Sequence, residues 1–252
     1  MPIHVTQPAN HVVMVSLDNQ AKRNAMSRDM LAELGALWSR LAADDDCRCI
    51  VLTGAGDKGF CAGADIAGDL SASEETAAMV NNALLKTTAH PKPIVAAVNG
   101  DCAGGGMELL LSTDIRIAAS HARFGLPEVK WAIYPFGGAT AKLVRQIGYV
   151  HAMDLILTGR LIDAEKAAAL HLVNRIEPAA KLLDAAIATA VTIADNSPVA
   201  VQAVKLRIAE EIAENALRHE DRDQALGDHV RASADFVEGV AAFREKRKAT
   251  YD

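Results

Sequence analysis

Three consecutive glycines, Gly104–Gly106, stand between an apolar run, PIVAAV, and a glutamate, Glu108. A glycine in a helix interior costs about 1 kcal/mol relative to alanine, so three together at the start of a predicted helix need a reason. A helix N-terminus offers free backbone N–H groups, and glycine lets a substrate approach the backbone closely. The stretch therefore suggests a place where a polarised oxygen meets amide donors, although close packing of helix on strand explains the glycines equally well.

A second glycine-rich turn, Gly54–Ile66, reads GAGDKGFCAGADI and follows the apolar run CIVLT. It can supply a second N–H group to the same oxygen if the two preceding strands are neighbours. Two converging amides form an oxyanion hole, in which one donor contributes about 3–4 kcal/mol to lowering the barrier. We expect Asp65 in this turn to be a local turn or cap residue rather than a catalyst. The glycine triplet does not match a phosphate-binding loop, because no Gly-Lys-Ser/Thr follows it and its spacing is not GxGxxG.

The elements that must position these turns alternate between strand and helix in the first half of the chain. A helix capped by Ser27 has apolar residues at helical spacing, and Ser71 with Glu74 forms a possible capping box for a helix to about Thr88. The predicted strands are 11–17, 48–54, 94–98, 114–118 and 122–125, with a short helix from the glycine triplet to about Ser112. This alternation predicts an α/β fold with parallel pairing.

The second half of the chain is mainly helical in its pattern. We predict helices at 139–147, 151–157, 164–170 after the cap Asp163, 180–195, 201–217 and 234–248, with one strand at 172–176. A tail with so little strand character can pack on a partner subunit or fold back on its own core, and the sequence leaves both arrangements open.

Composition narrows the class of protein. The 252 residues carry a net charge of −6, so no general basic field attracts nucleic acid or an anionic membrane. No apolar run approaches the roughly 18 residues of a spanning helix, and the first residues lack the pattern of a signal peptide, so we expect a cytoplasmic protein. The four cysteines, Cys47, Cys49, Cys61 and Cys102, lack zinc-like spacing and are expected to be buried thiols, with no disulfide and no metal.

Three blocks together resemble the signature blocks of the enoyl-CoA hydratase/isomerase (crotonase) family. They are FCAGADI, VNGDCAGGGMELLLSTDIRIAA and ARFGLPEVKWAIYPFGGA, and KRNAMS, LTGR followed by DAEKA, and DFVEGVAAFREKR extend the similarity over most of the chain. The resemblance implies a crotonase-like spiral of ββα units with a helical C-terminal segment. It divides the chain into a core, 1–195, with the active site, and a helical segment, 196–252, that serves oligomerisation and completes the CoA site.

The resemblance also implies a chemistry. Members of the family bind acyl-CoA thioesters and stabilise a thioester enolate between two amides, which by motif match are those of Ala62 and Gly105. Glu108 lies about one helical turn after Gly105, so its carboxylate can face the same pocket. The PE of GLPEV places a second glutamate at Glu128. In hydratases of the family such a pair adds water across a conjugated double bond, with Glu108 activating the water and Glu128 protonating Cα.

Substrate binding is also implied by the resemblance. The residues expected to bind CoA or the acyl group are Lys22, Arg23, Ala25, Ala62, Gly63, Ala64, Asp65, Ile66, Gly104, Gly105, Trp131, Pro135, Phe136, Phe243 and Lys246. No metal or redox cofactor is expected, because coenzyme A is part of the substrate. The family suggests a homo-oligomer, either a trimer or a dimer of trimers. For the REKRK run near the C-terminus, a charged solvated face is an equally good reading.

Two departures from the family pattern leave the reaction open. Ala132 and Phe136 stand where the family commonly has glycine. Phe136 would add bulk near the acyl chain or the water, which argues against straight long-chain substrates and allows a different enolate reaction such as double-bond isomerisation. Asp101 is predicted to be a solvent-facing loop residue. The remaining alternatives are that both glutamates are structural, or that the chain is a non-catalytic binding protein with this fold.

Overall fold

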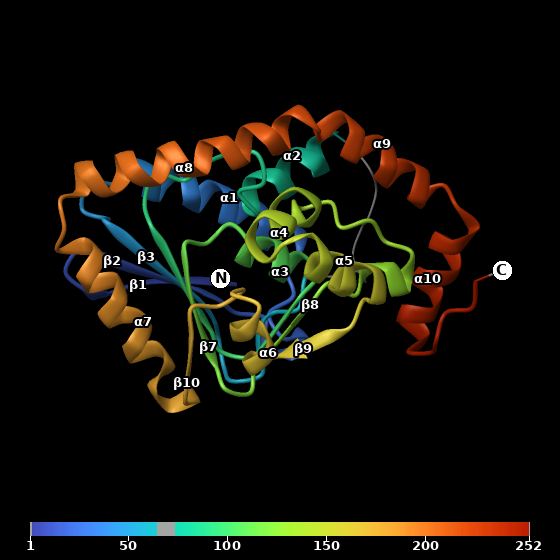
Figure 1. Cartoon of the computed structure of the whole chain (residues 1–252), viewed down its shortest axis with the longest axis horizontal. Helices are drawn as coiled ribbons and strands as arrows, with labels where there is room; N and C mark the ends of the chain where they lie inside the picture. The colour runs from blue at the N-terminus through green and yellow to red at the C-terminus, as the bar shows by residue number, and fades with distance from the viewer. Residues whose placement is uncertain (1, 65–73, 252) are drawn as a thin grey trace.

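The structure, a computed structural model, describes residues 2–64 and 74–251 and contains two β-sheets (Figure 1). The larger sheet has the order β1 (Ile3–Ala9), β2 (Val12–Leu17), β3 (Cys49–Gly54), β5 (Ile94–Val98), β7 (Ile115–Ala119), β10 (Arg175–Glu177). Only the β1–β2 pair is antiparallel among the pairs described within this sheet. The smaller sheet has the order β4 (Gly59–Cys61), β6 (Asp101–Ala103), β8 (Arg123–Gly125), β9 (Leu161–Asp163).

The chain passes from the larger sheet to the smaller one and then into a helix, and it repeats this path. β3 and β4 are followed by α2 (Glu74–Ala83), and β5 and β6 are followed by α3 (Gly105–Leu110). β7 and β8 are followed by the 3₁₀ turn η2 (Glu128–Trp131) and by α4 (Ala139–Ile147). This is the spiral of ββα units that the sequence predicted. Each turn of the spiral ends at the same side of the molecule, where the glycine-rich turns lie.

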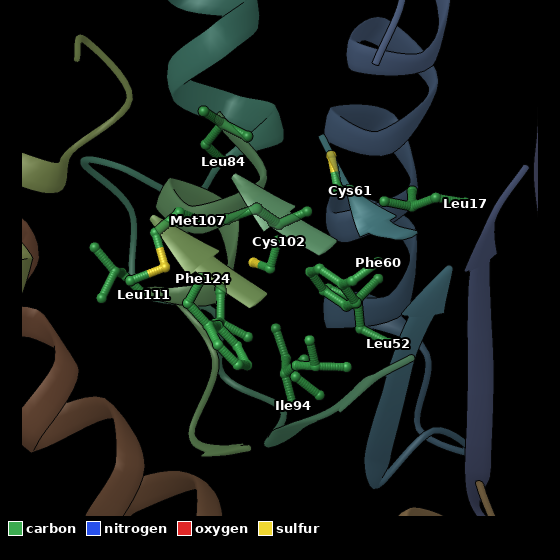
Figure 2. Packing of buried hydrophobic residues seen from close by; sticks show 14 of the residues in the cluster. Leu17, Leu52, Phe60, Cys61, Leu84, Ile94, Cys102, Met107, Leu111 and Phe124 are labelled. Atoms are coloured by element: carbon green, nitrogen blue, oxygen red, sulfur yellow. The ribbon is translucent and has the colours of Figure 1, made fainter. Parts of the chain in front are cut away.

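The central strands β3 and β5 are buried on both faces, because they carry apolar residues at nearly every position. In β3, Ile50 and Leu52 face the main core, in which α1 (Arg28–Ala43) and the smaller sheet also pack. Cys49 and Val51 face the other way, against α7 (Ala179–Ala194). Figure 2 shows the main core between the two sheets, where Leu52 and Phe60 approach Ile94 and Phe124.

Local sequence signals predicted the helix starts well. The Ser27 side chain accepts a hydrogen bond from the Met30 amide, and the Asp163 side chain accepts one from the Lys166 amide at the start of α6 (Ala164–Ala169). α5 (Tyr149–Thr158) and α7 also confirm predicted helices. The helix predicted to reach Thr88 ends at Ala83, and its proposed cap Ser71 lies outside the described residues. The strand predicted at 172–176 is found at Arg175–Glu177.

The C-terminal helices fold back along the core of the same chain, which is one of the two arrangements that the sequence left open. α8 (Pro198–Arg218) runs along one side of the molecule and leads through α9 (Glu220–Arg231) to α10 (Ala234–Glu245) (Figure 1). α10 packs on η2, where Phe243 and Trp131 make an edge-to-face ring contact with centroids 5.2 Å apart. The division of the chain into 1–195 and 196–252 stays a prediction.

A groove of about 750 Å³ lies between α8 and the core. Its lining does not include Glu108 or Glu128. Among the described residues, no helix combines the length and the apolar character needed to cross a membrane.

Candidate active site

The two glycine-rich turns lie side by side because β4 and β6 pair in parallel. Their register places Gly59 opposite Asp101 and Cys61 opposite Cys102, so the segments that follow both strands leave the sheet together. A Cβ atom built on Gly63 would lie 3.1 Å from the Gly105 nitrogen, and one built on Gly105 would lie 3.5 Å from the Ala64 nitrogen. The backbone amides of Ala64 and Gly105 are therefore neighbours.

The prediction that Ala62 supplies one of the two amides is wrong. The Ala62 N–H group donates a hydrogen bond to the Arg23 carbonyl at 3.0 Å, so it is already used within the protein. The Gly63 carbonyl accepts from Met26, and the Ala64 nitrogen lies beside Gly105. Gly63 has φ +103°, so the backbone turns within this segment and the sequence alone does not tell which amide faces Gly105.

Each glycine of the triplet meets a different structural requirement. Gly104 has φ +55° and donates its N–H group to the Gly125 carbonyl. A Cβ at Gly106 would come within 2.1 Å of the Cys61 carbonyl oxygen, so this position packs backbone on backbone. Gly105 begins α3, and the first N–H groups of a helix have no partner within it. Close packing and an accessible amide are therefore both present in one triplet.

Glu108 is buried on α3, with its carboxylate held by the start of α4. Oε1 accepts a hydrogen bond from the Ala139 N–H group at 3.1 Å. Oε2 lies 2.5 Å from the position that a Cβ would take at Gly137, so only glycine fits there. Burial raises the pKa of Glu108 above its ordinary value, while the amides of Ala139 and Gly137 and the charges of Lys86 and Lys142 oppose this rise.

Glu128 begins η2 and is also buried. Its Oε1 would lie 3.3 Å from a Cβ at Gly104, which places the carboxyl group against the glycine triplet. Its Oε2 is buried without a hydrogen-bond partner among the described residues. Burial raises the pKa of Glu128, and the charge of Glu108 raises it further. Because Glu108 has amide donors and nearby lysines that stabilise its charge, Glu128 is the member of the pair that keeps a proton more readily.

A charged cluster borders the Glu108 side of the site. The Lys86 ammonium is buried 4.2 Å above the Phe136 ring and pairs with Glu220 at 2.7 Å and Asp223 at 3.0 Å. The Tyr134 hydroxyl donates to Asp223 at 2.8 Å. Phe136 and Tyr134 thus contact the cluster formed with α9, whereas Trp131 packs on α10. This cluster could not be predicted from the sequence, because Lys86 and α9 meet only in the folded chain.

Asp101 is buried, so the prediction of a solvent-facing residue is wrong. Its Oδ2 accepts from Arg23 Nη1 at 2.7 Å and from Arg123 Nη2 at 2.8 Å. Its Oδ1 accepts from Arg123 Nε at 2.8 Å. Both guanidinium groups remain half exposed, at 56% and 51% of their side-chain surface. Asp101 therefore fixes the side chains of Arg23 and Arg123 by hydrogen bonds and ion pairs.

The predicted CoA-binding residues come from several parts of the chain. Lys22, Arg23 and Ala25 lie in one loop, where the Ala25 N–H group donates to the Lys22 carbonyl. Phe243 lies on α10, where its ring packs on Trp131, and Lys246 follows the end of that helix. Pro135 is buried beside Phe136. Asp65 and Ile66 lie outside the described residues.

The cysteines are buried free thiols, and burial raises their pKa values well into the range of an unreactive thiol. Within residues 2–64 and 74–251, no three His, Cys, Asp or Glu side chains come together in a way that could hold a metal ion.

Known proteins with similar sequences and structures are numerous. A family model described as enoyl-CoA hydratase/isomerase matches residues 7–252. Enoyl-CoA hydratase EchA19 of Mycobacterium tuberculosis is 39% identical over 99% of this chain and 96% of its own length. The short-chain-enoyl-CoA hydratase of Clostridium acetobutylicum is 35% identical, covering 97% and 95% of the two chains. The crystal structure of an enoyl-CoA hydratase/isomerase from Pseudoalteromonas atlantica matches with a TM-score of 0.92 at 30% identity, and it covers 100% of both chains.

Proposed function

Because the chain belongs to the enoyl-CoA hydratase/isomerase family, we propose that it catalyses the reversible hydration of a 2-enoyl-CoA thioester to a 3-hydroxyacyl-CoA. The observation that carries this proposal is the pair of buried glutamates, Glu108 and Glu128, next to the neighbouring amides of Ala64 and Gly105. Hydration of a conjugated thioester needs an oxygen-binding site, a base for water and an acid for carbon, and this arrangement can provide each of them.

The two amides would bind the thioester oxygen. As water attacks Cβ, the electrons of the double bond move toward the thioester and negative charge develops on that oxygen. Preorganised N–H donors stabilise this charge without reorganisation, and each is worth about 3–4 kcal/mol of the barrier. The Ala64 and Gly105 amides serve this purpose in our proposal, in place of the Ala62 amide that bonds to Arg23.

The two glutamates would exchange protons with the substrate on either side of the enolate. Glu108, as a carboxylate, takes a proton from the water whose oxygen bonds to Cβ. Glu128, as a carboxylic acid, then gives its proton to Cα as the enolate collapses to the thioester. The environments of the two glutamates support these roles. Burial and the Glu108 charge raise the pKa of Glu128, whereas the amides of Ala139 and Gly137 stabilise the charged form of Glu108.

No cofactor enters this scheme. Addition of water transfers no electrons to or from an external acceptor, and the two carboxyl groups move the protons. Coenzyme A arrives and leaves as part of the substrate. We keep isomerisation of the double bond as the alternative reaction, since one glutamate can shuttle the proton between two carbons; the presence of both acids favours hydration.

We also propose that the protein forms a homo-oligomer, a trimer or a dimer of trimers. Phe243 and Lys246 match positions that can complete the CoA site of a neighbouring subunit in the family. Exposed apolar residues on α8, including Val204 and Ile208, give a surface that association would cover. Light scattering coupled to size exclusion would measure the molecular mass, and a monomer would contradict the proposal.

Hydration of crotonyl-CoA, followed by loss of the conjugated thioester absorbance, tests the reaction. The wild-type protein is compared with Glu108→Gln and Glu128→Gln, and acyl-CoA binding is measured for all three. We expect wild-type turnover and a loss of about a hundredfold or more in each variant with binding retained, as two acid–base roles require. Tight binding without wild-type hydration would contradict the hydratase proposal, and isomerisation of a 3-enoyl-CoA would then be assayed.

A further inference from the structure

Lys142 is a buried lysine on α4 with 4% of its surface exposed. It stands one helical turn after Ala139, whose N–H group holds the Glu108 carboxylate. The Lys142 Nζ donates to the Leu85 carbonyl at 2.6 Å and to the Ser112 hydroxyl at 2.7 Å. Among the residues that the structure describes, no carboxylate forms an ion pair with Lys142, whose partners are a carbonyl and a hydroxyl group. A buried ammonium group that is not ion-paired is expensive to maintain, so its presence calls for an explanation.

The contacts of Lys142 join the three segments that surround Glu108. Ser112 follows α3 and lies about one turn beyond Glu108, and its hydroxyl donates to the Leu84 carbonyl at 2.6 Å. The Leu84 side chain lies against Gly137, where a Cβ would come within 2.3 Å of it. In Figure 2, Leu84 lies beside α3, near Met107. One ammonium group thus ties the end of α3, the segment after α2 and the first turns of α4 to each other.

We propose that Lys142 is a positioning residue for Glu108: it holds α4 against α3 so that the Ala139 amide meets the carboxylate, and it supplies the positive charge that balances that carboxylate. This inference rests on the proposed function, because it assigns Lys142 a part in placing the group that activates water. Lys142 itself touches no reacting atom in this scheme.

The charges around Glu108 distinguish Lys142 from the other nearby lysine. Lys86, from the segment after α2, is neutralised by Glu220 and Asp223 of α9. Glu128, from η2, is the other carboxyl group that faces Glu108, and the Gly137 and Ala139 amides complete its surroundings. Lys142 has hydroxyl and carbonyl partners only, so Glu108 is the anion that its charge can balance.

The direction of the electrostatic effect follows from the shifts of both groups. Burial lowers the pKa of Lys142 to about 7, and the charge of Glu108 opposes that shift. The positive charge of Lys142 in turn lowers the pKa of Glu108 against the effect of burial. Removing the ammonium group raises the pKa of Glu108. The acidic limb of the kcat profile, which reports ionisation of the base, then moves to higher pH.

Three variants test the inference in crotonyl-CoA hydration. Lys142→Met removes the charge and the donors at similar length, and Lys142→Arg keeps both. Lys205→Met is the matched control: the Lys205 side chain is 10% exposed, borders the same groove and donates to the Lys92 carbonyl, but it pairs with Asp114 and lies on α8. Each variant is checked by circular dichroism and thermal unfolding before kcat, KM and the pH profile are measured.

We expect Lys142→Met to lower kcat by about 10- to 100-fold with little change in KM, because displacement of a positioned group costs up to about a hundredfold in rate. The acidic limb moves to higher pH in this variant. Lys142→Arg keeps most of the wild-type kcat, and its acidic limb lies at the wild-type pH. Lys205→Met behaves as wild type. A purely structural role would lower the unfolding temperature of Lys142→Met without moving the limb of the remaining folded enzyme.

Ser112→Ala distinguishes the effect of the Lys142 hydrogen bonds from the effect of its charge. This variant also tests the inference if Lys142→Met does not fold. It removes one acceptor and keeps the ammonium group, so we expect a lower kcat with an unmoved acidic limb. A folded Lys142→Met, or failing that a folded Ser112→Ala, with wild-type kcat overturns the inference. If Glu108→Gln abolishes hydration while these variants are normal, only this inference fails; if Glu108→Gln remains active, the proposed function fails.

Discussion

A Cβ atom on Gly105 would lie 3.5 Å from the Ala64 nitrogen, which is an ordinary van der Waals contact. Gly105→Ala is therefore compatible with the fold, and alanine at a helical position is more favourable than glycine by about 0.5–1 kcal/mol. The added methyl group occupies space that the thioester oxygen needs beside the two amides. We expect an unfolding temperature at or above that of wild type, and hydration lowered by about a hundredfold or more.

Gly106→Ala is the matched control for this prediction. Its Cβ would lie 2.1 Å from the Cys61 carbonyl oxygen, so the backbone must move and the protein loses stability. Overpacking of this kind costs about 1–3 kcal/mol or more. Thermal unfolding and initial rates of both variants give the comparison. Full activity of a folded Gly105→Ala variant would contradict the assignment of the amide pair.

Much of the fold could be predicted because its signals are local. Ser27 and Asp163 are good helix caps, and β3 and β5 are continuous apolar runs flanked by turn residues. The strands of the smaller sheet were not all predicted, because β4, β6 and β9 have three residues each and show no periodicity. α9 was missed for a different reason: its buried residues are Asp223 and Gly227, so it has no apolar stripe.

The candidate site was predictable only in part, for similar reasons. The glycine triplet and Glu108 stand in one short stretch, and the resemblance to a family added Glu128. The choice between the Ala62 and Ala64 amides depends on which one faces β6, and the Arg23 carbonyl decides it. The charged cluster around Lys86 and the hydrogen bonds of Lys142 join segments from different turns of the spiral. No local sequence pattern predicts contacts of this kind.

Glu128→Gln should stabilise the protein, increasingly so as the pH rises. Burial and the Glu108 charge raise the pKa of Glu128 in the folded state, whereas an unfolded chain has its ordinary value of about 4.3. Between these two values the folded state holds more protons than the unfolded state. Stability then falls as the pH rises through this window, by at most about 1.4 kcal/mol per pH unit for one group. Glutamine has the same shape and does not titrate.

Urea unfolding of wild type and Glu128→Gln between pH 4 and pH 8.5 measures this dependence. We expect equal stabilities at the acidic end and a growing advantage of the variant toward the alkaline end. Parallel curves for the two proteins would show that the folded state does not hold the Glu128 proton, and the role of this residue as the acid would have to be abandoned.

Asp101→Asn should loosen the segment that carries Arg23. The carboxylate accepts from both Arg23 and Arg123, and the Arg23 carbonyl also holds the Ala62 amide of the glycine-rich turn. Since both guanidinium groups are half exposed, we expect a modest loss of stability, about 1–2 kcal/mol. KM for crotonyl-CoA should rise more than kcat falls, because Glu108 and Glu128, the proposed acid–base pair, are not moved.

Urea unfolding and steady-state kinetics at two salt concentrations check this prediction. Asp154→Asn is the control, because Asp154 pairs with Arg160 on the surface, and its removal should have a much smaller effect. Equal effects of the two substitutions would mean that Asp101 does not support the turn.

Phe136→Gly should widen the range of acyl groups that the enzyme accepts. Phe136 directly precedes Gly137, which lies against the Glu108 carboxylate, and we expect its ring to border the space next to the reacting carbons. Its removal opens that space and loses the contact with Lys86, at about 1 kcal/mol of stability, while Lys86 keeps its two carboxylate partners. Each methylene group accommodated in a pocket changes kcat/KM by about tenfold or more. The ratio of kcat/KM for a ten-carbon 2-enoyl-CoA to that for crotonyl-CoA should therefore rise by at least about tenfold.

Tyr134→Phe is the control, because it removes only the hydroxyl group that bonds Asp223, and it should leave this ratio of kcat/KM values unchanged. An unchanged ratio in Phe136→Gly as well would place the acyl group on another side of Glu108.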